Sequence, residues 1–139
     1  MAAGSVIAIW AAHGLAWVAG IGLSIVPVYQ GASTRATAPG EPPAETIMHS
    51  ATLIEANGTH AILLLLIPVL LTGVAVLALY VTRPQRPIRR FLLWIPGAIL
   101  LGFCAVGILS IGALYLPAAI VLLCGAGLQS TGGDRARTD

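Results

Sequence analysis

The pattern of hydrophobic and polar positions divides the chain into long apolar runs joined by short polar segments. The first run covers residues 5–28, and the second, AILLLLIPVLLTGVAVLALYV, covers residues 61–81. A helix needs about 20 apolar residues to cross the hydrocarbon core of a membrane, and both runs meet that length. We therefore expect a transmembrane helix in each of them.

The remaining apolar segment is too long for a single crossing. It continues without a charge from Phe91 to Gln129, and as one straight helix it would be nearly twice as long as the hydrocarbon core is thick. Its middle is rich in residues that interrupt helices: Gly107, Ser110, Gly112 and Pro117. These residues predict a tight hairpin near residues 109–113 between a third span, 91–109, and a fourth, 113–129. The alternative is one long tilted helix.

The polar segment between the first two spans, residues 29–60, has two parts. GASTRATAPGEPPA is small, polar and proline-rich, which favours an irregular loop. In the following ETIMHSATLIEANG, the spacing of Ile47, Ala51 and Ile54 is helical, and Asn57 with Gly58 forms a natural stop. This pattern predicts a short amphipathic helix, which either caps the bundle or offers a docking surface to a partner.

Composition makes the membrane interpretation the only reasonable one. Hydrophobic residues form 58% of the chain and charged residues 9%, with a mean hydropathy of +0.93, whereas about a quarter of the residues of a soluble protein are charged. The length leaves room for four spans and little else. The expected fold is an all-α membrane protein with a single membrane domain, residues 1–139, and a short extracytoplasmic helix between its first two spans.

Charge sets the expected orientation. The short segment 82–90 is rich in arginine, and positive charge in short loops favours the cytoplasmic side. We expect Pro84 and Pro87 to keep this loop from being helical, while its arginines reach anionic lipid head groups: Arg83, Arg86, Arg89 and Arg90. Four spans then place both termini, including the tail 130–139, in the cytoplasm. The net charge of +2 gives no indication of a nucleic-acid partner.

The first span carries a stripe of small residues. Small side chains recur at every fourth position, which places them on one helix face: Ala8, Ala12, Ala16, Gly20 and Ser24. Such stripes allow the backbones of two membrane helices to approach closely. We therefore expect this face to be a helix-packing surface.

The same span contains the one residue that suggests chemistry, His13, between Trp10 and Trp17. An ionisable group inside a membrane is a functional hypothesis by default, here ligation of haem or a chlorin, or a proton path. His60 lies at the extracytoplasmic end of the second span, whereas His13 lies nearer the cytoplasmic end of the first. These two histidines therefore cannot bind one iron within a straight bundle. The interpretation that we favour is a neutral histidine bonded to a Ser, Thr or carbonyl of a neighbouring helix.

Resemblances to two kinds of membrane protein help to choose between these interpretations of His13. The first span resembles light-harvesting helices, in which a histidine lies in an alanine-rich helix near tryptophan, although Ile9 stands where those helices have a small residue. In length and span count the chain resembles small multidrug transporters, but none of its spans carries the acidic residue that they have in their first helix. Cys104 and Cys124 differ in depth, which predicts packing residues rather than a disulfide.

A broader resemblance rests on SATLIEANG, which leads into the second span, and on SIGALYLPAAIVLL. In these stretches, about a third of the chain, the sequence resembles small four-helix membrane proteins of bacteria without an assigned function. The resemblance implies a bacterial plasma membrane. The hypothesis that follows is a non-catalytic accessory or structural subunit of a larger complex, in contact with the bilayer and with other integral subunits. The alternatives are a haem- or pigment-binding protein that uses His13, and a small carrier or channel.

Overall fold

Four long helices, one short helix and a two-stranded hairpin make up the described part of the chain. The computed structural model describes residues 3–34, 46–82, 87–107 and 111–135. Within them the elements in chain order are α1 Ala3–Ile25, β1 Pro27–Thr34, β2 Thr46–Thr52, α2 Leu53–Asn57, α3 Thr59–Val81, α4 Pro87–Val106 and α5 Gly112–Arg135. By length and composition, α1, α3, α4 and α5 could each cross a membrane. The prediction of four helices of crossing length is therefore confirmed.

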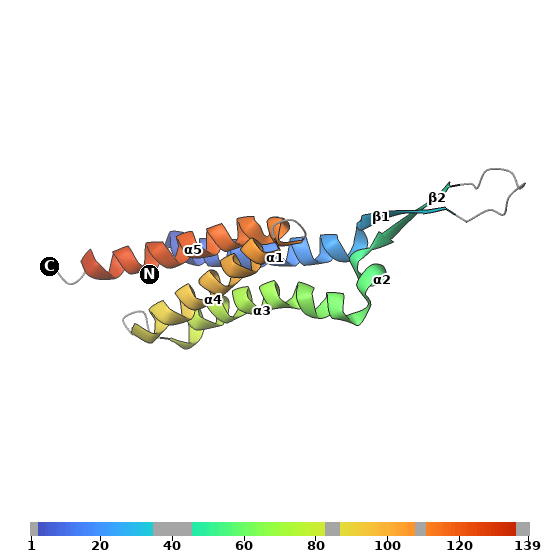
Figure 1. The fold of residues 1–139 in the computed structure, drawn as a ribbon. Helices are drawn as coiled ribbons and strands as arrows, with labels where there is room; N and C mark the ends of the chain where they lie inside the picture. Colours follow the sequence, from blue (N-terminus) through green and yellow to red (C-terminus); the bar gives the residue numbers. More distant parts are fainter. Residues whose placement is uncertain (1–2, 35–45, 83–86, 108–110, 136–139) are drawn as a thin grey trace, which may run out of the picture.

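The long helices form a closed ring of neighbours (Figure 1). Helix α1 packs on α3 and on α5, and α4 packs on the same two helices from the opposite side. The core lies where the four helices meet and consists largely of small and branched apolar side chains, among them Ile9, Ala12, Ala16, Leu65, Leu100 and Leu122. The start of α1, the end of α3, the start of α4 and the end of α5 lie at one end of the bundle, and the β1–β2 hairpin lies at the other.

The long uncharged segment does break in its middle. The backbone N–H of Gly112 donates to the carbonyl of Gly107 at 2.8 Å, closing the turn between α4 and α5. A Cβ on Gly112 would lie 2.6 Å from the carbonyl oxygen of Cys104, so no larger residue fits there. The predicted helical hairpin is thus confirmed, and the alternative of a single long helix is wrong. Ser110 lies outside the described residues.

The arginine-rich connection is shorter than expected. We predicted that Pro87 would prevent a helix before residue 91, but α4 begins at Pro87 itself. Proline is suited to the first helical position, because its missing N–H would have no intrahelical partner there and its φ is already helical. Residues 87–90 therefore belong to the first turn of α4, which brings Arg89 and Arg90 into the helix.

The segment between the first two spans also differs from the prediction. The expected amphipathic helix is confined to α2, and residues 46–52 instead form β2, which pairs antiparallel with β1 in a register from Pro27 opposite Thr52 to Thr34 opposite Thr46. Pro27 cannot extend α1. The paired strands satisfy each other's backbone groups, and three apolar residues at helical spacing provide too little buried surface to outweigh that pairing.

Helix α2 starts at a capping box that the sequence analysis did not use. The Thr52 hydroxyl accepts the backbone N–H of Glu55 at 3.2 Å, and the Glu55 carboxylate accepts the backbone N–H of Thr52 at 2.7 Å. These bonds lower the pKa of Glu55, chiefly through the Thr52 backbone donor. Gly58 then turns the chain into α3 with a φ of 62°, a conformation that favours glycine.

Candidate functional site

His13 lies in the interface between α1 and α3, with its side chain partly buried. A glycine on the facing helix leaves room for the imidazole, because a Cβ on Gly73 would lie 3.7 Å from His13 Cε1. Both ring nitrogens have partners within hydrogen-bond distance. Nδ1 lies 3.0 Å from Thr72 Oγ1 on α3, and the Trp17 indole N–H donates to Nε2 at 3.1 Å.

The chemistry of these partners sets the tautomer of His13. An indole N–H can only donate, so Nε2 must be the unprotonated, accepting nitrogen of a neutral imidazole. The proton is then on Nδ1, which donates to Thr72 Oγ1. Thr72 is fully buried, and its hydroxyl in turn donates to the carbonyl of Pro68 at 2.9 Å or of Val69 at 3.0 Å. The result is a one-directional chain of donors from α1 into the backbone of α3.

The imidazole of His13 lies between two tryptophan side chains. Trp10 and Trp17 approach His13 edge to face, with ring centroids 6.2 and 6.3 Å away. Trp10 makes a second link between the helices, because its indole N–H donates to the Tyr80 hydroxyl at 3.3 Å. The tryptophans are 47% and 46% exposed, so His13 and its two aromatic neighbours lie at the outer surface of the α1–α3 interface.

This arrangement limits what His13 can bind. Ligation of haem iron or chlorin magnesium uses a ring-nitrogen lone pair, and Trp17 occupies the one on Nε2. A metal could bind there only after the indole moved away. In the described parts of the chain, no group of three or more His, Cys, Asp or Glu side chains could hold a metal ion.

The small-residue stripe of α1 lies mainly against α5. Ala12, Ala16 and Gly20 are buried, and a Cβ on Gly20 would lie 3.3 Å from the Tyr115 hydroxyl. At Ala8, the two helices are so close that a Cβ on Gly125 would lie 3.2 Å from the Ala8 Cβ. Ser24, at the other end, bonds to the Gly20 carbonyl of its own helix.

The arginines near the start of α4 differ in their exposure. We predicted that all four would reach lipid head groups, but Arg89 is only 2% exposed and its side chain is buried within the bundle. The reason is helical geometry, since α4 begins earlier than expected and turns residue 89 inward. Arg90 is exposed. Arg83 and Arg86 lie outside the described residues.

Thr72 provides the hydroxyl partner expected for His13, although its position was not predicted, and two further polar contacts in the bundle were not predicted at all. Thr72 is the only serine or threonine in the run 61–81, and a lone hydroxyl in an apolar span is the signal that could have indicated it. The Tyr115 hydroxyl donates to the Leu65 carbonyl at 3.4 Å, and Gln129 donates to the Ser5 hydroxyl at 3.0 Å. Both cysteines, 104 and 124, are free thiols.

Family models, curated protein sequences and solved structures were compared with this chain, and none of them matches it.

Proposed function

We propose that this protein is an accessory or structural subunit of a larger membrane complex, packed by its outward helix faces against other integral subunits. The proposal rests mainly on one observation: the polar side chains of α1 and α3 form hydrogen bonds within the bundle. His13, Thr72 and Trp17 bond to one another and to the backbone, which joins helix to helix. These groups hold the bundle together, and the outward faces of the four long helices are mainly apolar.

The outward faces support this proposal. Large apolar side chains line the exterior of α3, where Leu63, Leu70 and Leu77 are exposed at intervals of seven residues. An apolar groove of about 400 Å³ lies between α1 and α5, with Val18, Gly22 and Leu114 among its lining residues. Helix faces of this kind suit contact with lipid chains and with other membrane helices.

The orientation is part of the proposal. We place the chain in a bacterial plasma membrane with the α3–α4 connection and both termini in the cytoplasm, following the bias of positive charge. The hairpin is then extracytoplasmic. A two-stranded ribbon is marginally stable by itself, and this one extends beyond the helices (Figure 1), where a partner's extracytoplasmic domain could support it.

The test is crosslinking in native membranes. A photoreactive amino acid replaces Leu70 on the outer face of α3 or Val18 in the α1–α5 groove, and the buried Ala75 serves as the matched internal position. We expect a discrete protein adduct at one or both outer positions and only intramolecular products at residue 75. The same partner should be recovered with the tagged chain in mild detergent. Recovery of the chain alone, with only lipid adducts at both outer positions, would refute the proposal.

A further inference from the structure

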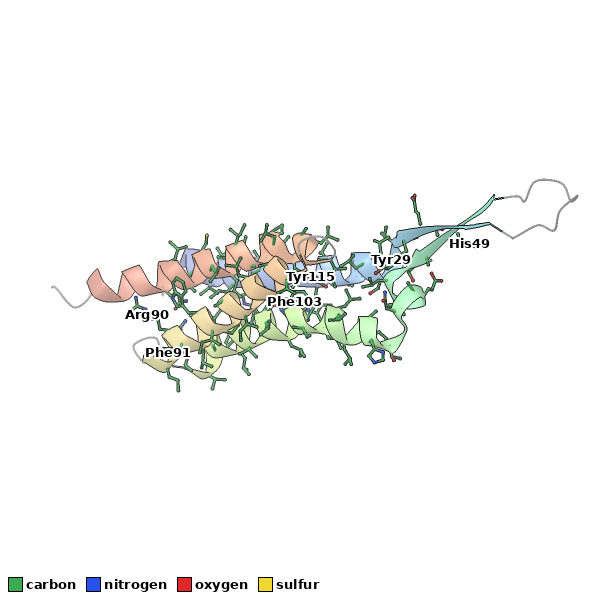
Figure 2. All side chains as sticks on the ribbon, in the orientation of Figure 1. Tyr29, His49, Arg90, Phe91, Phe103 and Tyr115 are labelled. Atoms are coloured by element: carbon green, nitrogen blue, oxygen red, sulfur yellow. The ribbon has the colours of Figure 1, made fainter. Side chains whose placement is uncertain are left out.

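A shallow hollow of about 250 Å³ lies on the first turns of α4 and is lined by Arg90, Phe91 and Trp94. Figure 2 shows Arg90 and Phe91 near each other at the start of this helix, at the end of the bundle where α1 begins. Phe91 is 64% exposed and Trp94 is 42% exposed. The hollow therefore combines a cation with two aromatic rings at the molecular surface.

The charges around this hollow are unbalanced. Among the described residues Arg90 has no ion-pair partner, and neither α3 nor α4 contains an aspartate or glutamate. In the sequence, six of the seven arginines belong to α4, to the segment just before it or to residues 130–139, and only the last of these contains acidic residues, Asp134 and Asp139. The guanidinium thus faces outward with unused donors, in a region that attracts anions.

We propose that Arg90, Phe91 and Trp94 form a binding site for one anionic phospholipid. The Arg90 guanidinium donates to the phosphate, as arginine does in paired hydrogen bonds with phosphate oxygens. Phe91 and Trp94 contact the glycerol and the first acyl carbons, which matches the preference of tryptophan for the membrane–water interface. Buried Arg89, one position away, takes no part.

The apolar part of the hollow favours a lipid over a free phosphate ion. A soluble phosphate would use the guanidinium alone and leave both aromatic rings exposed to water. A phospholipid uses all three residues at once, and it also fits the step from the charged first turn of α4 to the apolar residues that follow. The site rests on the membrane placement proposed above, but it requires no partner protein.

The test is lipid binding to the purified full-length chain in detergent, measured by native mass spectrometry. The probes are phosphatidylglycerol and phosphatidylcholine with identical acyl chains. The variants are Arg90→Gln, Arg90→Lys and, as the matched loss of one positive charge elsewhere in the chain, Arg137→Gln. We expect the wild type to prefer phosphatidylglycerol, and Arg90→Gln to bind it about tenfold more weakly, because a charged hydrogen bond is lost.

The controls separate a site from general attraction. Arg137→Gln should stay within about twofold of the wild type, and Arg90→Lys should keep the preference for phosphatidylglycerol because it keeps the charge. Trp94→Leu should weaken the binding of both lipids. Equal losses in Arg90→Gln and Arg137→Gln, or equal binding of the two lipids by the wild type, would overturn the proposal.

Displacement of phosphatidylglycerol by millimolar inorganic phosphate would also overturn it, in favour of a soluble anion. Because this experiment uses the isolated chain, it can fail while crosslinking to a partner succeeds, and it can succeed while crosslinking fails. The lipid site and the proposed subunit role are thus tested separately.

Discussion

Helix α1 is held on its two sides by different physical means. Against α5 the main means is close approach, because Gly125 on α5 leaves almost no space beside α1, and Gln129 adds one hydrogen bond to Ser5. Against α3 it uses hydrogen bonds, from His13 to Thr72 and from Trp10 to Tyr80. Inside a membrane the hydrophobic effect does not draw helices together, so packing and hydrogen bonding are the two contributions that remain.

The two interfaces of α1 should therefore tolerate different kinds of substitution. A close-packed interface fails when an atom is added, since neighbouring backbones cannot move apart cheaply. A hydrogen-bonded interface fails when a partner is removed, since the other group is left without a bond in an apolar environment. The substitutions that would break one interface should therefore have little effect on the other.

The largest effect should come from Gly125→Val, which breaks the α1–α5 contact. A Cβ at this position already lies 3.0 Å from Ile9 Cγ1, so we expect a loss of about 3 kcal/mol in the free energy of unfolding. Unfolding in mixed micelles with increasing sodium dodecyl sulfate measures it. Gly127→Val is the matched control, because nothing lies within 4 Å of a Cβ on Gly127. Equal losses in the two variants would contradict the close-contact explanation.

Next in size should be Thr72→Val, which breaks the α1–α3 contact while nearly preserving volume. The Nδ1–H of His13 loses its acceptor, and we expect a loss of about 1–2 kcal/mol. The measurement is the same unfolding titration, extended to a double-mutant cycle with His13→Leu. If the two substitutions are additive, the side chains do not interact and the proposed donor chain is wrong.

A smaller effect is expected at the capping box, which is an exposed hydrogen-bonded pair outside the four-helix bundle. Thr52→Ala should lower the stability of α2 by about 1 kcal/mol, measured by amide hydrogen exchange of residues 53–57. Global unfolding should hardly change. Exchange in residues 53–57 that is as slow as in the wild type would show that the cap contributes nothing.

The same capping box predicts a pH dependence. Because folding lowers the pKa of Glu55 below its ordinary value of 4.5, the contribution of its carboxylate is complete above that value and is lost as the pH falls through the folded pKa. NMR of the Glu55 carboxyl carbon should give a midpoint below 4.5 in the wild type and a higher one in Thr52→Ala. A wild-type midpoint at or above 4.5 would exclude the bond to the Thr52 backbone.

The smallest effect should come from Trp17→Phe, which removes only the donor to His13 Nε2. Bonds between membrane helices average about 0.6 kcal/mol, and this one lies within a single helix at a half-exposed position. We therefore expect at most about that loss. The more informative measurement is the ¹⁵N NMR spectrum of His13, in which the fixed Nδ1–H tautomer of the wild type should become a mixture in the variant. An unchanged spectrum would mean that the indole does not set the tautomer.

The sequence by itself determined the four helices and the break between α4 and α5. Both depend on local properties, namely the length of an apolar run and the cluster of residues around Gly112, which no tertiary contact has to supply. It also indicated the packing face of α1, because regular spacing of small residues directly reports a helix face. The hairpin was missed, since β1 and β2 stabilise each other and neither pattern shows the pairing alone.

Only the tertiary structure decided which partner each polar group has. His13 and Thr72 are 59 positions apart in the chain, and their bond depends on the rotation and tilt of two helices, which hydropathy does not specify. The same reason separates Arg89 from Arg90. The two residues are adjacent and have the same chemistry, but they point in different directions from α4, so the first is buried and the second is exposed. Apolar runs determine which segments become helices, and the packing of those helices determines what their few polar residues can do.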